Sequence, residues 1–199
     1  MSDTKEHILN VSFSLFLQKN FKEVTMQEII EKTGMSKGAF YHYFESKEQL
    51  LWEIINHFSS ALVTDFSKLS KGSLYQFYND YIKSFKDRID SLLQYQNGAK
   101  NGFNLNYYIL IFDAMRLFPD YRKKMVEALE IEQKAWEEIV HLARDKGEIR
   151  SSMTDEQIAK MFIYTSDGVG MYNIIKDTIE NITNTLPILW DSLYKSLKA

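Results

Sequence analysis

Apolar residues recur at spacings of three and four along almost the whole chain, which is the period of one face of an α-helix. Only two prolines and eight glycines occur in 199 residues, so few positions would interrupt a helix. No useful length of sequence alternates as a strand does. The sequence therefore predicts an all-α protein of about nine helices, over residues 3–19, 26–32, 36–43, 47–69, 74–96, 104–116, 119–146, 154–179 and 185–197.

Local signals at the ends of these segments support the helices. Pro119 suits the first turn of its helix, Gly147 suits a left-handed cap, and Pro187 falls in a first turn if Thr185 caps the last helix. Four pairs of residues have the spacing of a capping box, in which two side chains satisfy the free N–H groups at a helix start. These pairs are Asp3 and Glu6, Thr25 and Glu28, Ser46 and Gln49, and Thr154 and Gln157.

Composition narrows the class of protein. With no cysteine, the chain has no disulfide, thiolate metal site or cysteine nucleophile. No apolar run approaches the roughly 18 to 20 residues of a membrane helix, and the N-terminus is polar, so we expect a cytoplasmic protein without a membrane partner. The net charge is -3, which argues against bulk binding of nucleic acid. Residues 32–47 contain three lysines and one acid, so a positive surface could form locally.

Residues 25–44 have the pattern of two short helices joined by a tight turn at 33–36, where Gly34 permits the chain to reverse. An ordinary helical hairpin has the same outline. The second helix favours a helix-turn-helix instead, because a capping serine, small residues and polar-tipped rings suit the approach to a DNA groove.

One ordered pattern runs through the N-terminal quarter of the chain: Ile8-Leu9, Leu15-Phe16, Phe21, Thr25, Ile29, Gly34-Met35-Ser36, Gly38, Phe40-Tyr41, Tyr43-Phe44, Ser46-Lys47 and Leu50. By this pattern the segment resembles the TetR family. Asn20 stands where that family usually has glycine, and asparagine also accepts a left-handed turn. No arginine precedes Arg88, so Lys37 is the sole cationic candidate for a base edge in this segment.

The resemblance implies which residues contact double-stranded DNA. Lys37 and Ala39 would face the bases, and Thr25, Ser36, Tyr41, His42 and Lys47 would contact the phosphate backbone. Tyr43 is open between a core and a phosphate role, and Phe40 and Phe44 are assigned to the core by their spacing of four. The DNA-binding set is Thr25, Ser36, Lys37, Ala39, Tyr41, His42, Tyr43 and Lys47.

The rest of the chain is rich in aromatic residues, most of which we expect in a core. TetR-like proteins enclose a cavity for a small effector among their central helices, and tyrosines with other aromatics suit a largely apolar ligand. The candidate ligand-binding residues are Phe66, Tyr78, Tyr81, Phe85, Tyr107, Tyr108, Phe112, Trp136 and Phe162.

The last two helices of TetR-like proteins pair with those of a second subunit. Small residues at 166–170 would allow a helix of a partner to approach, although these glycines could simply kink a core helix. The two DNA-binding domains of such a dimer, or heads, would lie about one DNA turn apart and would read a palindromic operator. A repressor would leave this operator when its effector binds. The candidate homodimer interface comprises Tyr164, Gly168, Met171, Ile175, Leu189 and Leu193.

The expected organisation is a three-helix helix-turn-helix DNA-binding domain at 1–47 and a helical ligand-binding and dimerisation domain at 48–199. The sequence offers little support for an enzyme. Glu138 and His141 form one Glu-x-x-His pair where a di-iron site needs two, no phosphate-binding glycine loop occurs, and we expect neither a metal, a cofactor nor a catalytic residue. The alternative function is a helical interaction protein of the same fold that does not bind DNA.

Overall fold

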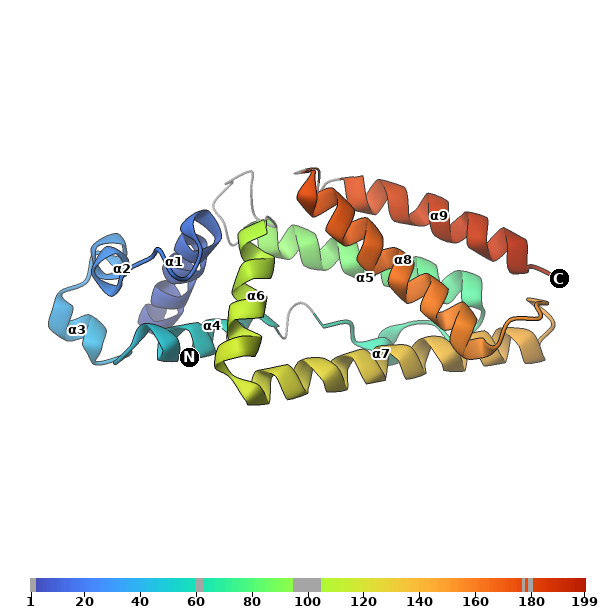
Figure 1. The fold of residues 1–199 in the computed structure, drawn as a ribbon, viewed down its shortest axis with the longest axis horizontal. Helices are drawn as coiled ribbons and strands as arrows, with labels where there is room; N and C mark the ends of the chain where they lie inside the picture. Colours follow the sequence, from blue (N-terminus) through green and yellow to red (C-terminus); the bar gives the residue numbers. More distant parts are fainter. Residues whose placement is uncertain (1–2, 60–62, 95–104, 177, 179–180) are drawn as a thin grey trace. The chain divides into compact units, whose positions relative to one another are not determined.

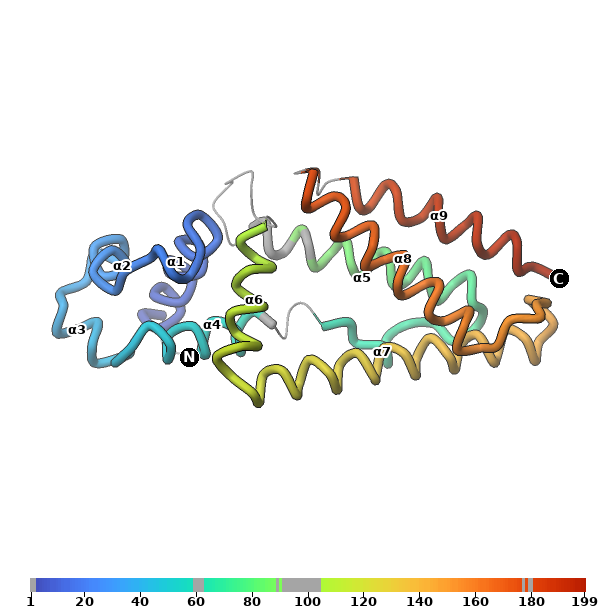
Figure 2. Tube along the Cα trace, in the orientation of Figure 1, coloured from blue at the N-terminus to red at the C-terminus, as the bar shows by residue number. Residues whose placement is uncertain are grey.

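The computed structural model describes residues 3–59, 63–94, 105–176, 178 and 181–199, and these are helical almost throughout (Figure 1). The all-α prediction is confirmed, since the described residues contain no strand beyond an isolated bridge between Ile149 and Lys198. A tube along the Cα trace follows the same order of elements (Figure 2). In chain order the elements are α1 (Asp3–Lys19), α2 (Met26–Thr33), α3 (Lys37–Tyr41), α4 (Lys47–Ser59), the short 3-10 helix η1 (Phe66–Lys68), α5 (Leu74–Gln94), α6 (Leu105–Leu117), α7 (Pro119–Asp145), α8 (Asp155–Ile175) and α9 (Ile182–Leu197).

The chain forms two compact units. Unit 1 comprises residues 1–63 and 89–124, and unit 2 comprises residues 64–88 and 125–199. Unit 1 therefore contains α6 as well as α1 to α4. Within it α6 packs on α1, and the Asn106 side-chain amide donates to the Leu17 carbonyl oxygen at 2.8 Å.

The core of unit 1 closes around α1. Phe13 of α1 stacks on Phe58 of α4 with ring centroids 4.2 Å apart. After α1 the chain turns at Asn20, whose φ of 66° is left-handed. The Asn20 Oδ1 accepts hydrogen bonds from the backbone amides of Lys22 and Glu23. The side chain thus satisfies backbone groups that a glycine there would leave to water.

Lys47, the first residue of α4, connects that helix to the segment between α1 and α2. Its ammonium donates to the carbonyl oxygens of Phe21 and Val24, each at 2.8 Å, and lies 4.5 Å from the centroid of the Phe21 ring. Partial burial lowers the pKa of Lys47, while the charge of Glu48 acts in the opposite direction. The contact fixes the start of α4 against the entry to α2.

Unit 2 has an aromatic core. Trp136 of α7, Phe162 of α8 and Trp190 of α9 are all fully buried. Trp136 and Phe162 stack with centroids 4.9 Å apart, and the Trp190 indole N–H donates to the Phe162 carbonyl at 3.1 Å. The three helices are thereby joined at one place.

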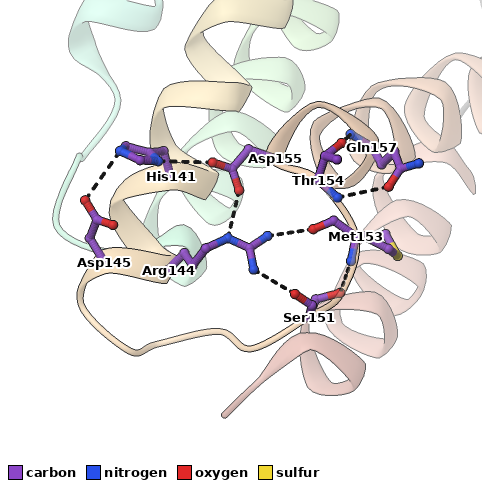
Figure 3. Close-up of polar contacts among 8 residues, drawn as sticks. All are labelled: His141, Arg144, Asp145, Ser151, Met153, Thr154, Asp155 and Gln157. Carbon is purple, nitrogen blue, oxygen red and sulfur yellow. Dashed lines mark hydrogen bonds and ion pairs between the residues drawn. The ribbon is translucent and has the colours of Figure 1, made fainter.

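The connection from α7 to α8 is held by a network of side chains (Figure 3). Gly147 ends α7 with φ 71°, as predicted. The Arg144 guanidinium then donates to the Asp155 carboxylate and to the carbonyls of Ser151 and Met153, at 2.8 to 2.9 Å. Thr154 and Gln157 form the complete predicted capping box.

A carboxylate from the same connection caps α5. The two oxygens of Glu148 accept from the amides of Leu74 and Tyr75, at 2.9 and 3.1 Å, and Oε1 also accepts from the Tyr194 hydroxyl of α9 at 3.1 Å. Negative charge is stabilised at a helix N-terminus, so this residue ties α5 to the connection and to α9.

Three predicted boundaries are wrong. The helix expected over 154–179 ends at Ile175. The helix expected over 47–69 ends at Ser59 and is followed by η1, with residues 60–62 outside the described part of the chain. The last helix begins at Ile182, so Pro187 lies inside α9 rather than in its first turn. Ile182 and Leu186 are both buried, and this burial extends the helix one turn before Thr185. Among the described helices, none is long and apolar enough to cross a membrane.

We expect Lys47→Met to loosen unit 1, because methionine keeps the apolar stem and leaves two carbonyl oxygens without their charged donor. Hydrogen bonds to a charged group contribute about 1.5 to 3 kcal/mol, so local opening of α1 to α4 should become at least about tenfold more frequent. Hydrogen exchange measures this opening. Lys22→Met, at an exposed side chain of the same loop, is the control. Equal exchange in both variants would show that the Lys47 contact contributes nothing.

Candidate DNA-binding site

The helix-turn-helix is formed by α2, a turn and α3. Gly34 has φ 70° and its N–H donates to the Glu31 carbonyl at 3.2 Å, which ends α2. Thr25 and Ser36 are the N-caps of the two helices, and their hydroxyl oxygens accept from the amides three residues later at 3.1 and 3.3 Å. Each hydroxyl still has its proton to donate, so capping and a contact to phosphate are compatible.

Two buried rings anchor α3. Phe40 and Phe44 are fully buried, with centroids 6.1 Å apart, so their predicted core assignment is confirmed. Thr33 at the end of α2 is also buried, and its backbone carbonyl is within hydrogen-bonding distance of Nε2 of His7 on α1. These buried residues and the contact to α1 hold α3 in place, with its outer face exposed. We call this buried support of α3 the frame.

Most of the predicted DNA-binding side chains lie on the outside of this frame. Tyr43 is half-buried beside His42, which leaves its two possible roles open. Lys47 is also half-buried and uses two of its three ammonium donors on carbonyls. The exposed members of the set are Thr25, Ser36, Lys37, Ala39, Tyr41 and His42.

Charge on this surface is small and local. Lys19 pairs with Glu28 at 2.6 Å, so these two charges offset one another. Lys37 is exposed and, among the described residues, forms no ion pair. Its charge is therefore available to a partner of α3.

Gly38 is a further surface feature of α3 whose role the fold does not explain. A Cβ built there would meet no neighbouring heavy atom within 4 Å. Glycine weakens a helix by up to about 1 kcal/mol relative to alanine, and here neither the backbone conformation nor the packing requires it. The position exposes bare backbone between Lys37 and Ala39.

The candidate ligand-binding residues fall into both units. In unit 2, Tyr78, Trp136 and Phe162 are fully buried in the aromatic core, with Tyr81 and the partly buried Phe66 and Phe85 beside them. The remaining three lie on α6 in unit 1, where Tyr107 is buried, Tyr108 is half-buried and Phe112 is 55% exposed. Phe66 also lines a recess of about 310 Å³ with Phe77 and Ile131.

The candidate dimer residues form an exposed stripe on α8 and α9. Tyr164, Gly168, Met171, Ile175 and Leu189 are exposed, whereas Leu193 is partly buried against the core. The side chains of Tyr172 and Ile188 enlarge the apolar surface, at 59% and 67% exposed. A groove of about 550 Å³ between the two helices is lined by Gly168, Tyr172 and Leu189, among others.

The amino-acid sequence of this chain is similar to those of known regulatory proteins. Residues 8–54 match the family described as bacterial regulatory proteins, tetR family. The chain is 51% identical over 51 residues to the uncharacterized HTH-type transcriptional regulator YerO of Bacillus subtilis, a match that covers 26% of this chain and 18% of that protein. It is 24% identical over 173 residues to YfiR, another uncharacterized HTH-type regulator of Bacillus subtilis, with 83% of this chain and 81% of that protein covered.

Solved structures share the fold over the whole chain. The reduced form of Escherichia coli NemR superposes with a TM-score of 0.61 at 21% identity, covering 100% of this chain and 98% of NemR. The SmeT–triclosan complex gives a TM-score of 0.64 at 17% identity, covering 100% of this chain and 93% of SmeT. Residues 8–54 therefore carry the DNA-binding region typical of the tetR family, and the chain shares its fold with a solved regulator of the TetR/AcrR family.

Proposed function

We propose that this regulator is a repressor that binds a palindromic operator as a homodimer and is released by a small, largely apolar effector. Residues 1–47 are the DNA-binding domain in this proposal, and residues 48–199 bind the effector and the second subunit. The observation that carries it is the outer face of α3, where an exposed lysine and bare helical backbone project from a buried aromatic anchor.

The exposed residues divide into two groups by chemistry. Lys37 can donate to acceptors on a guanine edge, and Ala39 can contact a thymine methyl group. The hydroxyls of Thr25 and Ser36 and the polar groups of the rings suit phosphates, as does the N-terminus of α2. One ammonium donor of Lys47 remains for a phosphate, although its first role is within unit 1.

Dimerisation through α8 and α9 would cover the exposed apolar stripe. Isolated apolar side chains on a surface are ordinary, but a continuous row along two helices is typical of an interface. A two-fold axis there relates two heads, which suits half-sites about one turn of DNA, roughly 34 Å, apart.

Relatives support repression and effector binding. NemR of Escherichia coli is named a transcriptional repressor and is 44% identical to this chain over 46 residues, 23% of each protein. SmeT is structurally similar and its structure contains triclosan, a small aromatic molecule. An effector that prefers one separation of the two heads would shift this protein away from DNA.

Gly38→Ala tests DNA binding directly. We expect the variant to be as stable as the wild type or more stable by up to about 1 kcal/mol, because alanine favours the helix and meets nothing. Its affinity for duplexes selected from a random pool should nevertheless fall at least about tenfold, since a Cβ would stand between α3 and the groove. Fluorescence anisotropy and thermal unfolding measure the two effects. Unchanged affinity would contradict the docking of α3 in the groove.

Gly168→Ala tests the dimer in the same way. A Cβ at this position meets nothing within 4 Å in its own chain, so the protomer should fold normally. If a partner helix approaches there, overpacking should weaken association at least about tenfold, as measured by analytical ultracentrifugation. Gly38→Ala is the matched control and should leave association unchanged. Equal association of both variants with the wild type would place the interface elsewhere.

A further inference from the structure

Unit 2 contains a recess at its surface between η1, α5 and the middle of α7. Its volume is about 310 Å³, at the lower limit of the roughly 300 to 1,000 Å³ that is typical of ligand pockets. The described residues that line it come from η1, the segment between η1 and α5, α5 and α7. The recess therefore differs from the place where Trp136, Phe162 and Trp190 join α7, α8 and α9.

The floor of the recess is apolar and partly aromatic. Phe77 of α5 and Ile139 of α7 line it and are almost fully buried. Phe66 of η1 stacks on Phe77 with ring centroids 6.4 Å apart and is itself only partly buried. Ile131 of α7 also lines the recess and is 59% exposed. Phe66 and Ile131 thus offer apolar surface that a ligand could remove from water.

The wall between η1 and α5 is fixed to α7 by two lysines. The Lys71 ammonium donates to Oε1 and Oε2 of Glu138 on α7, at 2.9 and 3.0 Å. The ammonium of Lys146, which follows α7, donates to the Gly72 carbonyl oxygen at 2.8 Å. The recess is therefore formed by contacts within the chain, and a ligand would not have to order this wall when it binds.

The charge of the lining is positive. Lys71, Lys134 and Glu138 are its charged members, so two positive charges and one negative charge leave a formal charge of +1. Glu138 is paired with Lys71. Lys134 is exposed and, within the part of the chain that the structure describes, forms no ion pair. A single available ammonium beside apolar surface is complementary to a monoanion that has an apolar body.

We propose that this recess binds a small monocarboxylate with an aromatic or short aliphatic body. The carboxylate accepts hydrogen bonds from the Lys134 ammonium, and the body lies against Phe66 and Ile131. The volume suits one or two rings rather than a long chain. This site goes beyond the function proposed above, because binding there requires neither DNA nor a second subunit.

Other small ligands fit the same residues less well. A cation would meet the available ammonium of Lys134, whereas Glu138, the one carboxylate among the described lining residues, already accepts from Lys71. A neutral molecule would make no use of the Lys134 charge. A phosphate ester with two charges would have one available ammonium and would otherwise lie on apolar surface, which leaves part of its lost hydration uncompensated.

Calorimetric titration of the full-length protein without DNA, at about 150 mM salt, tests the site with three probes that share one aromatic body. These are naphthylacetate, naphthylethanol and naphthylethylammonium. We expect the carboxylate to bind about fivefold more tightly than the alcohol, which is near the upper limit for an ion pair with an exposed lysine, and the ammonium to bind most weakly. Equal affinity for the carboxylate and the alcohol, or no binding of the carboxylate, would overturn the proposal.

Charge reversal locates the carboxylate. Lys134→Glu changes an exposed side chain, so the variant should fold normally, and it should bind the ammonium about fivefold more tightly than the carboxylate. Lys123→Glu makes the same change at another exposed position of α7 and is the matched control, which should keep the order of the wild type. The same reversal in both variants would mean that the probes respond to the charge of the whole surface, which overturns the site.

A second pair of variants locates the aromatic body. Ile131→Ala should weaken binding of all three probes about threefold, because it removes part of the apolar contact. Leu129→Ala truncates another exposed apolar residue of α7, outside the recess, and should leave the three affinities unchanged. Unchanged binding in Ile131→Ala, or an equal loss in Leu129→Ala, would contradict binding in this recess. Because no DNA is present, these results are independent of whether the protein binds an operator.

Discussion

The contact between the Lys47 ammonium and the carbonyls of Phe21 and Val24 determines how the helix-turn-helix is presented. It brings the start of α4 against the segment that leads into α2, while the Phe21 ring covers the charge. Since Phe40 and Phe44 anchor α3 to the same core, the outer face of α3 has little freedom to move within unit 1. In the proposed complex, Lys37, Gly38 and Ala39 could therefore contact a DNA groove without the entropic cost of ordering α3.

Local chemistry in the sequence predicted much of this frame. Thr25, Ser36 and Gly34 act through their own backbone and the next few residues, so their spacing alone identified the turn and both helix starts. Pro187 shows the limit of such signals. Its position suggested a helix start, but burial of Ile182 against distant helices decided the boundary, and a local pattern contains no information about that contact.

The functional surfaces were predictable to different degrees. Exposure of Lys37 and Tyr41 follows from the period of a short helix whose other face is apolar. The aromatic candidates of unit 2 cluster as expected for a core, but sequence could not say that Tyr107 and Phe112 belong to a different unit.

The central claim is that the proposed DNA-binding domain recognises a DNA sequence through α3. Selection of the purified wild-type protein and its Lys37→Gln variant on a random duplex library, at about 150 mM salt to suppress loose electrostatic binding, tests it most directly. The account predicts that the wild type recovers a two-fold symmetric sequence with half-sites about one helical turn apart, and that the variant recovers the same spacing with relaxed base preference. Failure of a folded, dimeric wild-type sample to enrich any sequence would contradict it.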